Sequence, residues 1–141
     1  MKAEDWVHFF GHRAITARHK TTFEITKDEW LTPRGDCIVG VKADKACADL
    51  DERLKELLRT EGCRVELEFL VGGERFVVHA KGSPRLTLRD RRDMVVRKSS
   101  FVCDRTLAIG ADGAASDFPR SIVSKLRDEK AKGLLVVRAY V

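Results

Sequence analysis

The feature that most constrains this chain is that its second half repeats its first. The matched segments are 7–11 with 78–82, 23–27 with 94–98, 38–41 with 106–109 and 50–58 with 118–126. The best alignment pairs Arg34 with Arg105 and leaves three extra residues in the first copy, Gly35-Asp36-Cys37. Ordered matches with one short gap indicate a duplicated unit of about 70 residues.

Both copies show the same order of predicted elements: a strand, a longer extended stretch, a strand, one helix and a final strand. Each helix is predicted from a single apolar stripe, such as Leu50, Leu54 and Leu58 in the first copy. The predicted strands and stretches are Trp6–Phe10, Ile15–Thr26, Cys37–Val41 and Arg64–Leu70, then Arg75–Ala80, Leu86–Lys98, Leu107–Ile109 and Leu134–Tyr140. We expect an α+β fold whose two β-rich units form a pseudo-twofold antiparallel sheet or barrel. Without βαβ alternation, nothing demands parallel strands.

The chain has the length of one domain, so we expect a single domain over residues 1–141 with repeats at about 1–71 and 72–141. No apolar run approaches the roughly 20 residues of a bilayer span, and the first ten residues do not resemble a secretory signal. The four cysteines form no C-x-x-C pair, which favours reduced thiols. A cytoplasmic protein without a membrane partner is expected.

Charge is distributed unevenly along the chain. Residues 1–70 carry a net charge of −2 and residues 71–141 carry +7, within a total of +5. A one-sided basic surface favours anionic partners, of which nucleic acid is the commonest, although a dense charge run is also typical of a solvated strand face. The candidate residues for binding nucleic acid or another anion are Arg34, Arg85, Arg89, Arg91, Arg92, Arg97, Lys98 and Arg105.

Polar residues that occur in only one copy are the stronger candidates for function, because positions shared by both copies serve the fold. His12, His19 and Glu24 are replaced in the second copy by Ser83, Asp90 and Val95, and Asp36 lies among the extra residues. Imidazoles, carboxylates and the nearby segment 32–36 predict an acid/base or metal site. The alternative is that Glu24 lies on the wet face of a strand and that segment 32–36 is a turn. The candidate catalytic residues are His12, His19, Glu24 and Asp36.

Several signatures of catalysis and binding are missing from the sequence. It contains no phosphate-cradling glycine-rich loop, no dinucleotide fingerprint and no nucleophile elbow. The acidic pair that precedes a lysine in a common metal-nuclease core is absent as well. Aromatic residues make up 7% of the chain, and no stacking array like that of RNA-binding sheets is evident.

The run from Gly11 to Gly40, which includes Thr21-Thr22-Phe23-Glu24-Ile25-Thr26-Lys27-Asp28, resembles an archaeal family known only as a domain of unknown function. The run from Val96 to Ile109 is similar to the same family, and the resemblance covers nearly the whole chain. It implies an archaeal cytoplasmic protein and carries over no established activity, although some members bear loose nuclease-like labels. The family pattern has histidines where this chain has Ser83 and Asp90.

Three functional hypotheses remain open. The first is a nucleic-acid-binding or nucleic-acid-processing protein, which would be an endonuclease-like hydrolase if it cleaves phosphodiester bonds. In that case Glu24 and Asp36 would hold a divalent ion such as Mg²⁺ or act as base, His12 or His19 would move protons, and Arg34 would stabilise phosphate. The second is an enzyme or binder for a small anionic metabolite at the same residues. The third is a non-catalytic interaction module, such as a homo-oligomer that pairs through strand edges.

Overall fold

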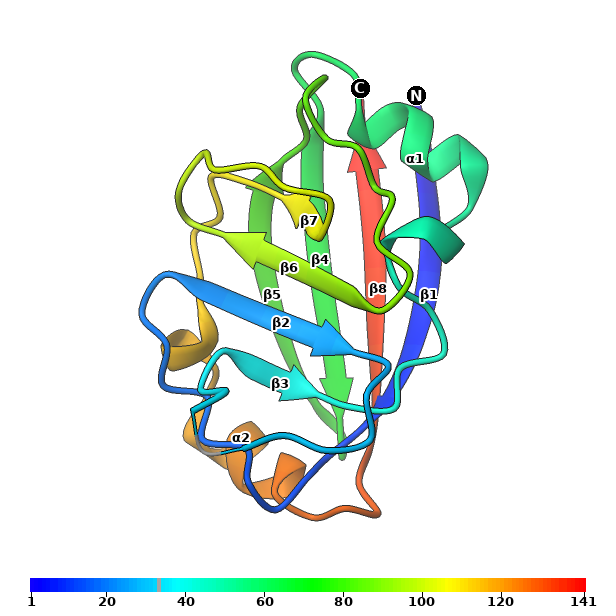
Figure 1. Cartoon of the computed structure of the whole chain (residues 1–141). Helices are drawn as coiled ribbons and strands as arrows, with labels where there is room; N and C mark the ends of the chain where they lie inside the picture. The colour runs from blue at the N-terminus through cyan, green and yellow to red at the C-terminus, as the bar shows by residue number, and fades with distance from the viewer. Residues whose placement is uncertain (33) are drawn as a thin grey trace.

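The computed structural model describes residues 1–32 and 34–141 and shows two four-stranded sheets packed face to face (Figure 1). Sheet A has the order β1-β8-β4-β5, with the bounds Lys2–Phe10, Lys132–Tyr140, Arg64–Val71 and Glu74–Lys81. Sheet B has the order β3-β2-β6-β7, with the bounds Ile38–Gly40, Thr22–Thr26, Asp93–Arg97 and Thr106–Ala108. The strands of sheet B cross those of sheet A in Figure 1, as in an orthogonal β-sandwich.

The core lies between the two sheets and is built around four phenylalanines. Phe23 of sheet B meets Phe69 of sheet A edge-on with ring centroids 5.4 Å apart, and Phe69 meets Phe118 at 4.8 Å. Phe9 needs close neighbours without side chains, since a Cβ on Gly133 would lie 2.2 Å from its ring. Strand periodicity places Phe9, Phe23 and Phe69 on the inner faces of the sheets, and Phe118 reaches the core from the segment before α2.

The α+β class and the pseudo-twofold arrangement are confirmed, but the expectation of purely antiparallel pairing is wrong. In sheet B, β2 pairs with β3 and β6 pairs with β7 in parallel, while only the central β2–β6 pair is antiparallel. Each parallel connection is a loop, so the absence of βαβ alternation did not exclude it. The expected barrel is not formed by the described residues either: only single bridges, Phe10 to Val41 and Lys81 to Ile109, join the two sheets at their corners.

Two short helices lie at opposite ends of the sandwich (Figure 1). Helix α1 (Glu52–Leu58) begins after Asp51, whose side chain accepts a hydrogen bond from the Leu54 amide, and α2 (Arg120–Leu126) begins after Pro119. Short 3₁₀ turns, Cys47–Asp49 and Ala115–Asp117, precede them. Within the described residues, no helix is long and apolar enough to cross a bilayer.

The two copies are interleaved within sheet A, where β1 and β4 of the first copy alternate with β8 and β5 of the second. The predicted hairpin that joins the copies is present, with Gly72 and Gly73 at φ angles of 53° and 82° as a tight two-residue turn requires. Even strained backbone is repeated: the buried mates Ala17 and Leu88 both have left-handed φ angles, 48° and 51°. The duplication therefore extends to local backbone conformation.

The structure corrects the position of the three extra residues. The Glu24 amide donates to the carbonyl of Cys37, and the Val95 amide donates to that of Arg105, each at 2.8 Å. Cys37 and Arg105 are therefore counterparts, and Asp36 corresponds to Asp104. The three extra residues therefore fall between Asp28 and Gly35, and Pro33 lies outside the described residues. Asp36 consequently has a counterpart, and Arg34 is not the mate of Arg105.

Candidate functional site

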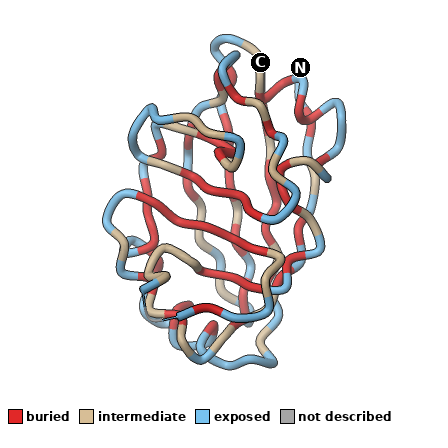
Figure 2. The backbone as a smooth tube through the Cα atoms, in the orientation of Figure 1, coloured by how far each residue is buried: buried red, intermediate tan, exposed pale blue. Residues whose placement is uncertain are grey.

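The pseudo-twofold axis crosses sheet B where Glu24 of β2 faces its own repeat mate, Val95 of β6. Both side chains lie on the outer face of the sheet, opposite the core, yet Glu24 is only 7% exposed and Val95 only 1%. Figure 2 shows that β2 and β6 are buried along nearly their whole length. A carboxylate at this point therefore occupies a largely desolvated position in the middle of the β2–β6 ladder.

Polar side chains from both copies lie near Glu24. We call Glu24 and these neighbours the axial cluster, which comprises Glu24, Cys37, Asp93, Arg97, Cys103 and Arg105. The Arg105 guanidinium lies 3.1 Å from Asp93 Oδ2 and 3.6 Å from Glu24 Oε1, so it bridges the two carboxylates. The Cys37 thiol lies 3.9 Å from Glu24 Oε1. One arginine thus faces two buried acids.

The charged members of the axial cluster come mainly from the second copy. The repeat mates of Asp93, Arg97 and Arg105 are Thr22, Thr26 and Cys37, which carry no charge. Comparison of the two copies had singled out Glu24 for the same reason. Each copy therefore contributes charged residues that its repeat mate lacks, and the axial cluster lies where the two copies meet rather than within the first copy alone.

Burial, together with the neighbouring Asp93 carboxylate, raises the pKa of Glu24 to about 7, although Arg105 opposes the shift. Burial also raises the pKa of the Cys37 thiol to about 11. Burial opposes ionisation of Cys103 too, but hydrogen bonds from Thr106 and the Arg105 amide and a contact with Arg97 outweigh it, so the pKa of Cys103 is lowered. Glu24 can therefore change its protonation state near neutral pH, as a general acid or base must.

The other predicted catalytic residues are not gathered around Glu24. Nδ1 of His12 accepts a hydrogen bond from the Ala14 amide and lies in a turn against the end of α2. Nδ1 of His19 accepts from the Thr21 amide. The backbone carbonyl of Asp36 accepts from the His19 amide at 3.2 Å, which makes these two residues neighbours. Among the described residues, no hydrogen bond or ion pair joins the side chains of His12, His19 or Asp36 to Glu24.

The described part of the chain contains no group of three His, Cys, Asp or Glu side chains placed to hold a metal ion. Within the axial cluster, Arg105 occupies the space between the Glu24 and Asp93 carboxylates, where a cation would otherwise sit. The donor set therefore fits an internal ion pair better than the predicted divalent ion.

The predicted basic residues are spread along the β2–β6 ladder, and most already have partners. Lys98 lies 3.2 Å from Asp117, Arg92 lies 3.8 Å from Asp28, and Arg85 donates to the Ser100 carbonyl. Arg97 Nη2 contacts the Cys103 sulfur, and its Nε is buried without an acceptor among the described residues. The exposed side chains of Arg34, Arg89 and Arg91 take part in no ion pair within the described residues.

Two exposed aromatic residues were missed by sequence reasoning. Trp30 is 72% exposed and Phe101 is 60% exposed, and each lies four residues beyond the end of its strand, β2 or β6. Backbone hydrogen bonds carry the 71-residue offset to Asp28 and Ser99, whose carbonyls accept from the Lys42 and Gly110 amides, and at this offset Trp30 aligns with Phe101. The Arg97 guanidinium lies 5.0 Å from the Phe101 ring centroid. Extending the repeat alignment through the loops would have revealed the pair.

Comparison with known proteins places this chain in a family. Residues 7–139 match the family described as "Domain of unknown function (DUF371)". The chain is also 44% identical over 120 residues to "Uncharacterized protein MJ0206" of Methanocaldococcus jannaschii, a match that covers 85% of this chain and 88% of that protein. The similarity therefore spans both repeats and the axial cluster between them, and the chain belongs to the DUF371 family, as its resemblance to an archaeal domain of unknown function indicated.

Proposed function

We propose that the protein binds single-stranded nucleic acid along sheet B, through the loops and basic residues at the two ends of the β2–β6 ladder. The observation that carries this proposal is the pair of exposed repeat-mate aromatics, Trp30 and Phe101, on the loops that leave the β2–β6 ladder. Aromatic side chains that are exposed at both ends of a sheet can serve as stacking platforms for a single strand. Bases of any sequence stack on such rings, and each stacked base contributes about 1–3 kcal/mol of binding free energy.

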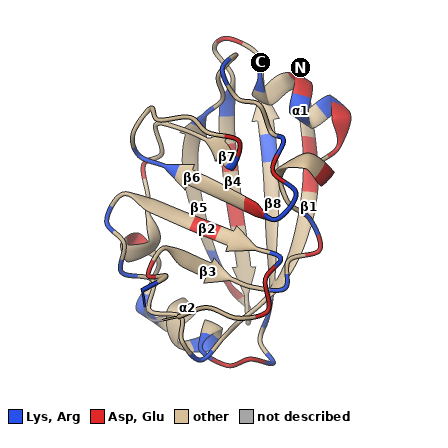
Figure 3. Ribbon diagram, viewed as in Figure 1, with Lys and Arg blue, Asp and Glu red and all other residues tan. Residues whose placement is uncertain are grey.

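Cations at both ends of the same ladder support phosphate contacts. The Lys98 amide donates to the Thr21 carbonyl at one end, and the Lys27 amide donates to the Arg92 carbonyl at the other. Figure 3 shows basic segments at both ends of the β2 and β6 arrows. A five-residue ladder spans roughly 17 Å, so the two groups of cations can contact separate phosphates of one strand.

The ion pairs that these cations now make do not prevent such contacts. The Lys98–Asp117 and Arg92–Asp28 pairs are exposed, and pairs of this kind contribute about 0–1 kcal/mol. A phosphate releases condensed counterions when it binds a cation, which favours exchange at low salt. Arg89 and Arg91 add exposed charge beside the ladder without losing an ion pair within the described residues.

Fluorescence anisotropy with labelled single-stranded DNA and RNA over a salt series tests the proposal. Contacts to four phosphates predict a slope of log affinity against log salt of about −3. Trp30→Ala and Phe101→Ala should each weaken binding about tenfold, whereas Trp6→Ala, which removes an exposed tryptophan from sheet A, should not.

Replacing Arg89, Arg91 and Arg92 together by Glu should abolish binding at moderate salt. Binding that survives this reversal, or that responds to Trp6→Ala as strongly as to Trp30→Ala, would contradict the proposed surface. No binding at low salt would also contradict it.

Hydrolysis of the bound strand is a second candidate, favoured by the pKa of Glu24 near 7 beside Arg105. Glu24 would take a proton from the water that attacks phosphorus, and Arg105 would stabilise charge on the phosphate. As the P–O bond breaks, the proton would pass from Glu24 to the sugar oxygen that leaves. Cleavage of a labelled strand should then rise with pH through about 7 and be lost in Glu24→Gln, while binding persists. Absence of cleavage in the parent, or equal cleavage in Glu24→Gln, would rule this candidate out.

A further inference from the structure

One end of the outer face of sheet A carries a row of basic side chains. Arg64 of β4 lies directly opposite Lys81 of β5 on one side and Tyr140 of β8 on the other, and Lys2 of β1 lies opposite Tyr140. Lys81, Arg64, Tyr140 and Lys2 therefore form one cross-strand line, which we call the basic row. Side chains directly opposite each other on antiparallel strands have Cβ atoms about 4.5–5.5 Å apart.

The basic row places like charges side by side without compensation. Arg64 and Lys81 are opposite each other, which is unfavourable in a sheet, and neither makes an ion pair within the described residues. Lys2 is 3.9 Å from Glu4 and lies 5.7 Å from the centroid of the Tyr140 ring. The next row inward is instead neutralised, with Arg138 2.9 Å from Glu66. A bound anion would relieve the repulsion in the basic row.

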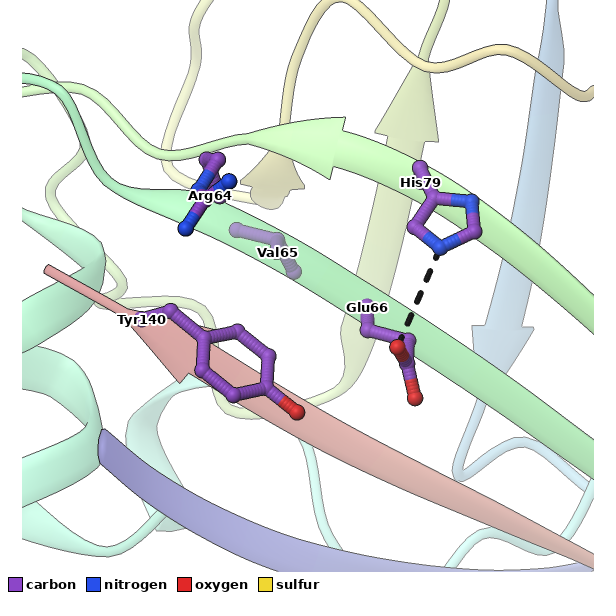
Figure 4. Close-up of a pocket in the computed structure, with 5 residues that line it drawn as sticks. All are labelled: Arg64, Val65, Glu66, His79 and Tyr140. Atoms are coloured by element: carbon purple, nitrogen blue, oxygen red, sulfur yellow. Dashed lines mark ion pairs between the residues drawn. The ribbon is translucent and has the colours of Figure 1, made fainter.

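The basic row borders a pocket of about 270 Å³. Figure 4 shows its lining from three strands: Arg64, Val65 and Glu66 on β4, His79 on β5 and Tyr140 on β8. A second pocket of about 310 Å³ shares Arg64 and His79 and is also lined by Lys81. His79 is fixed from both sides, with Nε2 3.8 Å from Glu66 and Nδ1 3.5 Å from Asp112. Both halves of the basic row thus open onto space sized for a small ligand.

The repeat provides an internal control for the basic row. The mates of Lys81, Arg64 and Tyr140 are Phe10, Lys132 and Gly72, and the mate of Lys2 is Gly73. The equivalent row at the other end of sheet A therefore keeps one cation and loses both lysines and the phenol. The fold therefore does not require the basic row, because the equivalent row at the other end of sheet A forms the same strand pairs with only one cation.

We propose that the basic row binds the phosphate group of a small phosphate monoester. Arg64 would grip two phosphate oxygens through its planar guanidinium, and Lys81 would add a point charge from the facing strand. The Tyr140 ring lines the pocket that takes the rest of the ligand. The site lies on sheet A and is independent of nucleic-acid binding on sheet B.

Titration of the isotope-labelled protein with AMP, followed by NMR, tests this site and locates it. Amide shifts should centre on residues 64–66, 79–81 and 140, and adenosine without the phosphate should not produce them. Arg64→Gln and Lys81→Gln should each weaken AMP binding at least tenfold, as loss of a charge-assisted contact does. Lys132→Gln removes the repeat mate of Arg64 and is the matched control, with affinity unchanged.

An unperturbed spectrum at millimolar AMP would overturn the proposal. Equal shifts with adenosine, or equal weakening by Lys132→Gln and Arg64→Gln, would overturn it as well. The spectra of the variants report whether each one is folded. Because Arg64→Gln should leave single-strand affinity unchanged, failure of this site and failure of the sheet B surface are distinguishable.

Discussion

The pseudo-twofold axis crosses both sheets, and at each crossing a glutamate faces its own valine mate. In sheet B Glu24 faces Val95, and in sheet A Glu68 faces Val136. The two glutamates behave oppositely. Burial and the Asp93 carboxylate raise the pKa of Glu24, whereas hydrogen bonds from Arg75 and Arg138 lower the pKa of Glu68.

This difference shows that position on the axis does not determine chemistry. Glu68 lies on the outer face of sheet A with two arginines as partners, so its charged form is favoured. Glu24 shares one arginine with a second buried carboxylate, so its charged form is penalised. A duplicated chain can place one carboxylate on the axis, where a symmetric dimer would be forced to place two.

The largest difference in unfolding free energy is expected when a second glutamate is placed at each crossing. Val95→Glu would bury a second carboxylate opposite Glu24 and should cost about 4–5 kcal/mol of unfolding free energy at pH 8. Val136→Glu would add a carboxylate near Arg138 and should cost about 2 kcal/mol. Urea unfolding of both variants at pH 8 and pH 5 measures the difference. Equal losses would show that the two crossings do not differ in solvation.

The second prediction concerns the pH dependence of stability when the ionisable group of Glu24 is removed. The pKa of Glu24 is about 7 in the folded protein against 4.5 as the ordinary value, so the parent loses stability as pH rises through this range. Glu24→Gln cannot ionise and should gain about 3 kcal/mol relative to the parent between pH 4 and pH 8. Urea unfolding across that range measures the gain. A pH-independent difference would mean that the pKa of Glu24 is not raised.

The smallest effect is expected at Glu68, and it has the opposite sign. Its pKa is lowered in the folded protein, so its contribution is present above the ordinary value of 4.5 and is lost as pH falls below that value. Glu68→Gln should therefore destabilise the protein by about 1 kcal/mol at pH 7, and the loss should shrink towards pH 3. Thermal unfolding at the two pH values, with added salt as a control for screening, measures it. A gain in stability at pH 7 would contradict the assignment.

Much of the candidate site was accessible from the amino-acid sequence, and some of it was not. Glu24 was singled out because its mate is Val95, and that asymmetry proved to lie on the axis. Arg105 was paired with Arg34 instead of Cys37, because the three extra residues were placed after Arg34. Matching letters cannot locate a short insertion inside a loop, whereas backbone hydrogen bonds identify the equivalent positions directly.

The amino-acid sequence alone was enough to predict the duplication, the order of strands and helices in each copy and the apolar faces that form the core. These features follow from local periodicity, which each segment carries independently of the rest of the chain. Three features became visible only in the tertiary structure. The strands β2 and β3 run parallel, the two copies interleave in sheet A, and Asp93, Arg97 and Arg105 surround Glu24. Those features depend on which strands become neighbours, and the pKa of a carboxyl group depends on the solvent and charges that these neighbours leave around it.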